Sequence, residues 1–150
     1  MPRKHLLPPF LEGVISPDVY ERWLGRKAEA HVKRDRKRTQ SNVTLSLYKA
    51  AIHAAVLRSN RCDAYTGELL NWRLISTYNN KDAKLGKHKY KSRFALLPTI
   101  DHIHAGATGA SFNICSWRTN DAKSDLSFED FVELCQKVLA KAGYAVKKIV

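Results

Sequence analysis

The residues of this chain that are best suited to chemistry lie between positions 101 and 123. Asp101 and His102 are adjacent, and Asn113, Asn120 and Lys123 follow in that order. A carboxylate and an amide oxygen are hard ligands that suit Mg²⁺ or Mn²⁺, and an imidazole can take a proton from water near neutral pH. A lysine can hold a phosphate through its positive charge. This set of residues predicts metal-assisted cleavage of a phosphodiester.

The elements that would position these residues can be predicted from the surrounding pattern. Residues 94–104 are apolar and then polar, which favours a strand, and residues 105–110 form a loop of small residues. Residues 111–116 suit a second strand, antiparallel to the first, and residues 117–124 suit a short helix. The expected order is therefore strand, loop, strand and helix.

The adjacency of Asp101 and His102 raises a geometric question. In an extended strand, neighbouring side chains point to opposite faces. Both residues can therefore serve one site only where the strand ends or twists.

The rest of the chain predicts four further elements. Two are helices, one from Ser16 and Pro17 into the basic run 26–38 and one over 45–59. A strand or hairpin arm is expected over 69–78, and a last helix from Ser127 to Gly143. Serine suits a helix start, proline suits the first turn, and glycine suits the position after the last turn. The last helix has an apolar stripe that should face the core, with Cys135 inside it.

The composition indicates one soluble domain with a polyanionic partner. The chain has 150 residues, 44% of them hydrophobic, and 26 Lys and Arg against 14 Asp and Glu give a net charge of +12. Such a charge favours binding to phosphates. The residues expected to contact nucleic acid lie in two basic segments and on the short helix: Arg26, Lys27, Lys33, Arg34, Arg36, Lys37, Arg38, Lys84, Lys87, Lys89, Lys91, Arg93 and Arg118. A merely solvated basic surface is the competing interpretation of both segments.

The cysteines and the apolar runs predict a cytoplasmic protein. Cys62, Cys115 and Cys135 are an odd and sparse set, which argues against a disulfide framework and fits a reducing compartment. No apolar run approaches a membrane-spanning length, and the N-terminal residues lack the apolar core of a signal peptide.

The ordered set Asp101-His102-Ile103, Asn113 and Asn120 resembles the motif of HNH endonucleases, whose fold is the ββα-metal (His-Me finger) core. Residues 120–125, Asn-Asp-Ala-Lys-Ser-Asp, are also similar to a run in the HNH domain of RNA-guided CRISPR nucleases. The resemblance covers about residues 60–140. It implies an α+β fold with this core and additional N-terminal and C-terminal helices.

The resemblance also implies a role for each residue. Asp101 and Asn120 would hold one divalent cation, Mg²⁺ or Mn²⁺, against the scissile phosphate. His102 would be the general base, and Asn113 would order the loop and help to orient it. Lys123 and Arg118 would hold phosphate oxygens, and the products would carry 5′-phosphate and 3′-hydroxyl ends.

The chain departs from many relatives of this family, which hold a structural zinc ion with two Cys-x-x-Cys pairs. Here residues 62–65 and 115–118 each keep only one cysteine, so a four-cysteine zinc site cannot form. Tyr65 and Trp117 are expected to replace the zinc by packing.

The sequence therefore predicts a metal-dependent endonuclease acting on DNA, with residues 1–43 as a basic helical extension and residues 44–150 as the nuclease domain. A homodimer is one arrangement that would allow double-strand cleavage. Two other functions remain open: a non-catalytic nucleic-acid-binding protein on the same scaffold, and a basic RNA- or ribosome-associated module.

Overall fold

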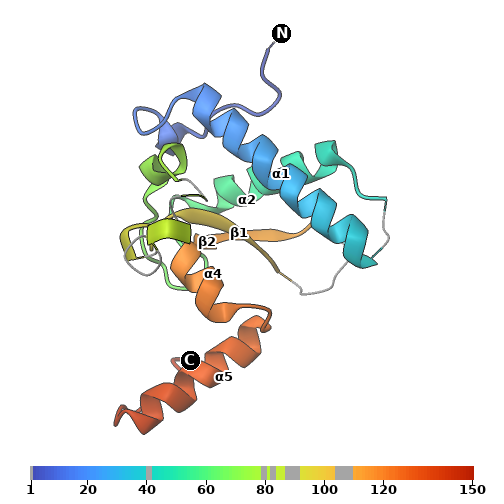
Figure 1. The fold of residues 1–150 in the computed structure, drawn as a ribbon. Helices are drawn as coiled ribbons and strands as arrows, with labels where there is room; N and C mark the ends of the chain where they lie inside the picture. Colours follow the sequence, from blue (N-terminus) through green and yellow to red (C-terminus); the bar gives the residue numbers. More distant parts are fainter. Residues whose placement is uncertain (1, 40–41, 79–80, 82–83, 87–91, 104–109) are drawn as a thin grey trace.

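The computed structural model describes all residues except 1, 40–41, 79–80, 82–83, 87–91 and 104–109, and it is a mixed α+β structure. Its elements are η1 (Pro9–Leu11), α1 (Pro17–Thr39), α2 (Leu45–Ser59), η2 (Trp72–Ser76), β1 (Pro98–His102), β2 (Phe112–Ser116), α4 (Trp117–Lys123) and α5 (Phe128–Lys141). Figure 1 shows α1 and α2 on one side of the β1–β2 hairpin, α4 on the other side, and α5 projecting away. In the part of the chain that the structure describes, no helix is long and apolar enough to cross a membrane.

The helices begin where side-chain hydroxyls can satisfy free backbone N–H groups. Thr44, Ser116 and Ser127 each accept a hydrogen bond from the backbone N–H three residues further on, at the starts of α2, α4 and α5. Ser16 does the same at α1, with a distance of 3.2 Å to the N–H of Val19. The starts that the sequence predicts for the first and last helices are therefore confirmed.

The core lies between the two long helices and one face of the hairpin. Tyr20 and Leu24 of α1, Tyr48 and Ile52 of α2, and Phe112 of β2 belong to one buried cluster. These residues recur at helical spacing on α1 and α2, so each helix turns one apolar stripe toward the hairpin.

The hairpin has a simple antiparallel register. Ile100 pairs with Ile114, Asp101 with Asn113, and His102 with Phe112. The predicted strands and the short helix after them are confirmed, with a first strand of five residues (Pro98–His102) in place of the expected 94–104.

The prediction of a strand over residues 69–78 is wrong. Residues Trp72–Ser76 form a 3₁₀ helix, and Leu69 makes an isolated bridge with Cys62. The buried residues Trp72 and Ile75 are three positions apart, which is the repeat of a 3₁₀ helix and not of a strand.

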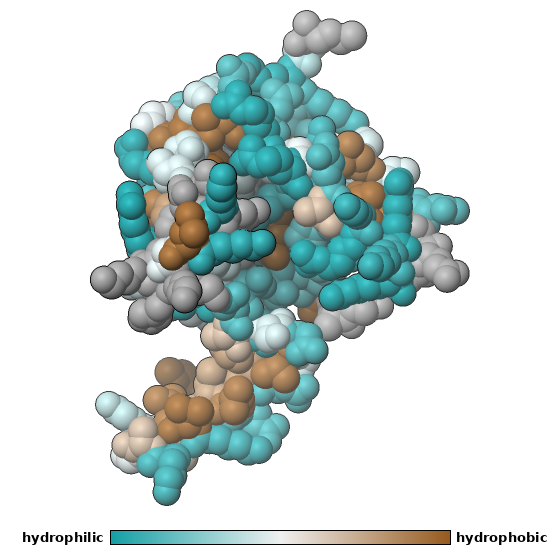
Figure 2. All heavy atoms as spheres, viewed as in Figure 1, coloured by the Kyte–Doolittle hydropathy of each residue, from teal (hydrophilic) through white to brown (hydrophobic). Residues whose placement is uncertain are grey.

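The prediction that the stripe of the last helix, with Cys135, packs in the core is also wrong. None of the residues of α5 is buried, and Cys135 is exposed. Figure 2 shows apolar side chains along the projecting helix. Its contact with the rest of the described chain includes the ring of Phe128, stacked on that of Tyr65 at 5.5 Å. An amphipathic pattern indicates that one face of a helix is apolar, but it does not identify the surface on which that face packs.

Candidate functional site on two faces of the hairpin

The two adjacent residues of the motif point to opposite faces of the hairpin. Cross-strand partners share a face, so Asp101 lies with Asn113, and His102 lies with Phe112 on the other face. Each of the two residues meets partners from a different part of the chain. We describe these as the Asp101 face and the His102 face.

On the Asp101 face, the carboxylate is bound by two side chains. Lys123 Nζ lies 2.9 Å from Asp101 Oδ2, and the hydroxyl of Tyr65 donates to the same oxygen at 2.5 Å. The Lys123 side chain is 4% exposed and that of Asp101 is 12% exposed, so this ion pair is largely removed from solvent. The amide of Asn113 donates to the Tyr65 hydroxyl at 3.4 Å. Burial, and then the hydrogen bond to Asp101, raise the pKa of Tyr65.

The buried carboxylate of Asp63 accepts hydrogen bonds from the residues that support the Asp101 face. Its Oδ2 accepts from the backbone N–H of Ser116 at 2.9 Å and from the hydroxyl of Thr119 at 2.8 Å, both at the start of α4. Its Oδ1 accepts from the N–H of Tyr65 at 2.8 Å. Burial acts to raise the pKa of Asp63, but these hydrogen bonds outweigh it and the pKa is lowered. Asp63 thus fixes Tyr65 and α4 relative to each other, and its residue type and spacing in the sequence do not indicate this role.

On the His102 face, the imidazole is held by a carboxylate from α1. His102 Nε2 lies 2.8 Å from Asp35 Oδ2, and the hydroxyl of Tyr48 donates to the same oxygen at 2.5 Å. Burial acts to raise the pKa of Asp35, but the hydrogen bonds from Tyr48 and His102 and the nearby imidazoles outweigh it, so the pKa is lowered. Asp35 is therefore an anion that faces His102, and it orients the imidazole ring.

A second histidine lies beside this dyad. The ring of His31 is 5.1 Å from that of His102, and His31 is 5% exposed. Burial, and then Arg34 and His102, lower the pKa of His31 to about 3. Its Nδ1 is buried and has no hydrogen-bond partner among the described residues. His31 is thus a neutral, buried ring that packs beside His102.

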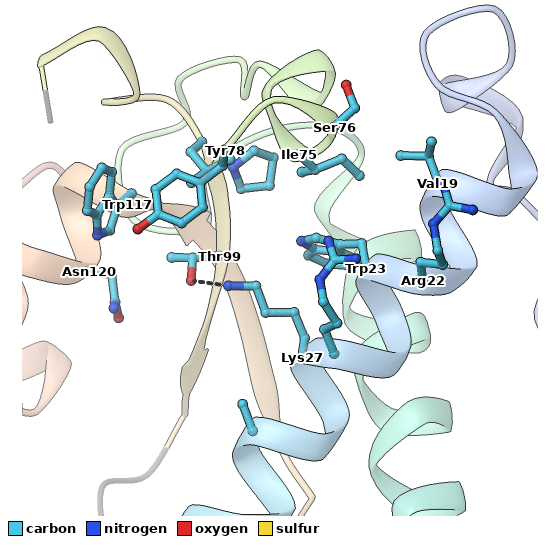
Figure 3. A pocket seen from close by; sticks show the side chains of 14 residues that line it. Val19, Arg22, Trp23, Lys27, Ile75, Ser76, Tyr78, Thr99, Trp117 and Asn120 are labelled. Atoms are coloured by element: carbon cyan, nitrogen blue, oxygen red, sulfur yellow. Dashed lines mark hydrogen bonds between the residues drawn. The ribbon is translucent and has the colours of Figure 1, made fainter. Parts of the chain in front are cut away.

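A cavity of about 580 Å³ lies between α1, η2, β1 and α4 (Figure 3). Asn120 lines it, as does Thr99, whose hydroxyl accepts from Lys27 Nζ at 3.3 Å. Asn120 is one helical turn before Lys123 on α4, and Thr99 is two residues before Asp101 on β1. The cavity therefore does not belong to one side of the hairpin alone, because α1 forms one of its walls and Asn120 and Trp117 of α4 lie on another.

The structure brings together some of the predicted site residues and separates others. Asp101, Asn113 and Lys123 lie within one network, whereas Asn120 lines the cavity together with Thr99 and His102 lies on the opposite face. Arg118 forms an ion pair with Glu68 at the surface.

The predicted nucleic-acid contacts on α1 are not equivalent. Arg26 and Lys27 line the cavity, and Arg36 binds the carbonyl of Val43 at 2.7 Å. The exposed members of the set in the described part of the chain are Arg26, Lys33, Arg34, Arg36, Lys37, Arg38, Lys84, Arg93 and Arg118. Lys87, Lys89 and Lys91 lie outside the described residues.

The donor atoms on the Asp101 face fit a hard divalent cation. Asp101 supplies a carboxylate and Asn120 an amide oxygen, which are ligands that Mg²⁺ and Mn²⁺ accept. Among the described residues, Lys123 and Tyr65 both contact Oδ2 of Asp101, and Oδ1 is the second oxygen of the same carboxylate. Groups of three or more His, Cys, Asp and Glu do not gather into a metal cluster among the described residues. A cation on this pair would therefore take its other ligands from water and phosphate.

The partners of the motif were not visible in the sequence. Asp35 lies within the basic run, 67 residues before His102, and Tyr48 lies within an apolar helical stripe. An acidic residue inside a run of lysines and arginines was the one signal that could have drawn attention to Asp35.

Comparisons of the chain with protein-family models, with curated proteins and with solved structures found no match, so its function has to be inferred from the geometry.

Proposed function

We propose that this protein is a metal-dependent endonuclease of the HNH type, which hydrolyses phosphodiester bonds in DNA. The observation that carries the proposal is the ion pair between Asp101 and Lys123 within a strand–strand–helix unit, with Asn120 one helical turn before Lys123 on the same helix. That order of elements, and these residue types in these places, are what the resemblance to HNH endonucleases leads one to expect.

The Asp101 face would hold the cation. Asp101 through Oδ1 and Asn120 through its amide oxygen would bind Mg²⁺ or Mn²⁺, which when bound supplies charge stabilisation for the leaving 3′ oxygen. Lys123 would hold Asp101 in place and add positive charge beside the phosphate.

The His102 face would supply the base. With Nε2 donating to Asp35, the lone pair of the neutral imidazole is on Nδ1, which would accept a proton from the attacking water. Asp35 would fix this tautomer and stabilise the charge that His102 gains.

The separation of the two residues is compatible with one reaction. In an in-line displacement, the attacking and leaving oxygens lie on opposite sides of phosphorus. A phosphate at the end of β1 would have Asp101 on one side and His102 on the other, because the strand ends at His102.

A second candidate is a non-catalytic nucleic-acid-binding protein, and one observation favours it. The ammonium group of Lys123 already neutralises Asp101, so the carboxylate is satisfied without a metal ion. The basic surface of α1 would serve such a protein equally well.

The test is cleavage of supercoiled plasmid DNA with Mg²⁺, Mn²⁺ or EDTA. Wild-type protein should nick or linearise the plasmid only with a metal ion, and His102→Ala should abolish cleavage while DNA binding is kept. His53→Ala is the matched control, because His53 lies on α2 and is bonded to Tyr20, away from the site. If the wild-type protein cleaves the plasmid with neither metal ion but binds DNA in a salt-sensitive way, the second candidate is favoured.

A further inference from the structure

The cavity beside Asn120 has one wall of cations and one of aromatic rings. Arg22 and Arg26 are four residues apart on α1, so they share a face of that helix, and Lys27 follows directly. Tyr78 and Trp117 lie across the cavity from them, with ring centroids 5.3 Å apart (Figure 3).

The cations of this wall lack an acidic counterpart within the cavity. None of the described residues that line it is an Asp or a Glu. Lys27 Nζ is bonded to the neutral hydroxyl of Thr99. Burial, and then Arg26 and Arg34, lower the pKa of Lys27 to about 8. Three positive side chains in a hollow without a carboxylate favour a bound anion, because the anion relieves their mutual repulsion.

The aromatic rings of the cavity indicate which class of anion it would bind. Tyr78 and Trp117 are half-buried, and the cavity volume of about 580 Å³ is that of a small-molecule site. Aromatic rings beside a positive groove are the usual means of holding an unstacked base next to its phosphate. Ser76, Thr99 and Asn120 add hydrogen-bonding groups that could meet the edge of a base.

We propose that this cavity binds one nucleotide of a nucleic-acid strand, with its phosphate at Arg22, Arg26 and Lys27 and its base against Tyr78 and Trp117. The site rests on the proposed function in one respect, since Asn120 would place this nucleotide next to the cleaved bond. Binding itself needs neither metal nor cleavage.

The experiment is a fluorescence titration in EDTA, which follows the tryptophan emission of the intact chain. The probes are a single-stranded thymidine octamer, thymidine monophosphate, thymidine and inorganic phosphate. The octamer and the monophosphate should both change the emission saturably, the octamer more tightly, and thymidine and phosphate much more weakly. Trp117→Phe should reduce the change and keep the affinity within about twofold, because a ring remains for stacking, and the change that is left reports Trp23, which also lines the cavity.

Charge-removing variants locate the phosphate. Arg26→Gln and Lys27→Gln should each weaken octamer binding about tenfold, the loss expected for one charged hydrogen bond. Arg26 is exposed, so its variant should fold even if that of Lys27 does not. Lys141→Gln removes the same charge from an exposed position on α5 and should weaken binding less than twofold.

Two results would overturn the inference. Arg26→Gln could weaken binding no more than Lys141→Gln does, which would leave only non-specific attraction by the net charge. Alternatively, phosphate could bind as tightly as the monophosphate, which would remove the base from the site. Failure of the proposed function alone looks different, because an inactive protein would still bind the octamer through Arg26 and Lys27.

Discussion

The Asp101 face and the His102 face are built on adjacent residues of one strand, yet they solve different electrostatic problems. On the first, an acidic side chain is neutralised by a buried lysine from α4. On the second, a histidine is held by a buried carboxylate from α1. In both, a tyrosine donates to the carboxylate oxygen at 2.5 Å. The difference shows that two neighbouring residues of a strand, because they point to opposite faces, bind partners from different parts of the chain.

The comparison predicts that the Asp101 face contributes more to stability. Lys123→Met would leave the Asp101 carboxylate largely buried without its cation, and breaking such a pair should lower the free energy of unfolding by about 3 kcal/mol. Urea unfolding measures this. Lys137→Met is the control, because Lys137 forms an exposed pair with Glu133 and its loss should change the free energy of unfolding far less.

A double variant sharpens this result. Asp101→Asn in the Lys123→Met protein removes the stranded charge and should recover at least half of the lost stability. Additive losses would show that the two side chains do not form an energetically coupled pair.

On the His102 face, the carboxylate that orients the histidine should matter to cleavage. Asp35→Asn keeps the size of the side chain but removes the charge that orients His102, so the cleavage rate should fall about 100-fold. DNA affinity should change little, because Asp35 is buried beneath the basic surface. Single-turnover cleavage and a binding titration separate the two effects. An unchanged rate in a folded Asp35→Asn protein would mean that the dyad is structural only.

Acid should destabilise the His102 face first. The pKa of His31 is lowered from 6.5 to about 3, so the unfolded chain binds one proton more than the folded chain between these values. Stability should therefore decrease as the pH falls through this window, by about 1.4 kcal/mol per pH unit from this group. Thermal unfolding from pH 7 to pH 4 measures it, and His31→Phe should flatten the dependence. An equal slope in the variant would assign the acid sensitivity to other groups.

The smallest effects should come from the two tyrosines. Tyr65→Phe and Tyr48→Phe each remove one hydrogen bond to a carboxylate, and each should lower the free energy of unfolding by about 1 to 2 kcal/mol. Similar losses would support the view that the two hydroxyls contribute equally to the free energy of unfolding. A loss in only one variant, measured by urea unfolding, would break the symmetry of the comparison.

Local rules predicted most elements of this fold from the sequence. Ser16 and Ser127 mark helix starts that the structure contains, and the strands predicted over residues 94–104 and 111–116 correspond to the hairpin that the structure contains at 98–102 and 112–116. Gly143, with a φ of 96°, follows the last helix as expected. These features depend on neighbours within a few residues, which a single sequence displays.

Features that depend on distant contacts could not be predicted in the same way. The stripe of α5 has the spacing of a buried face, yet its surroundings leave it exposed. The contact of Asp35 with His102 joins residues 67 positions apart, and no local pattern encodes it. The role of Asp63 could not be predicted either, because Asp63 binds Thr119 at the start of α4, which is 56 residues away in the sequence. The candidate site was thus predicted as a set of residues, but not as two faces.

The central claim is that Asp101 and His102, although they point to opposite faces, act on one phosphodiester. The most direct measurement is the single-turnover cleavage rate of a labelled DNA duplex with Mg²⁺ for wild type, Asp101→Asn, His102→Ala and the double variant. Each single variant should lose at least about 100-fold, and the double variant should be no slower than the slower single variant, because groups that act as a unit are not additive. A His102→Ala protein that cuts at the wild-type rate would contradict the claim.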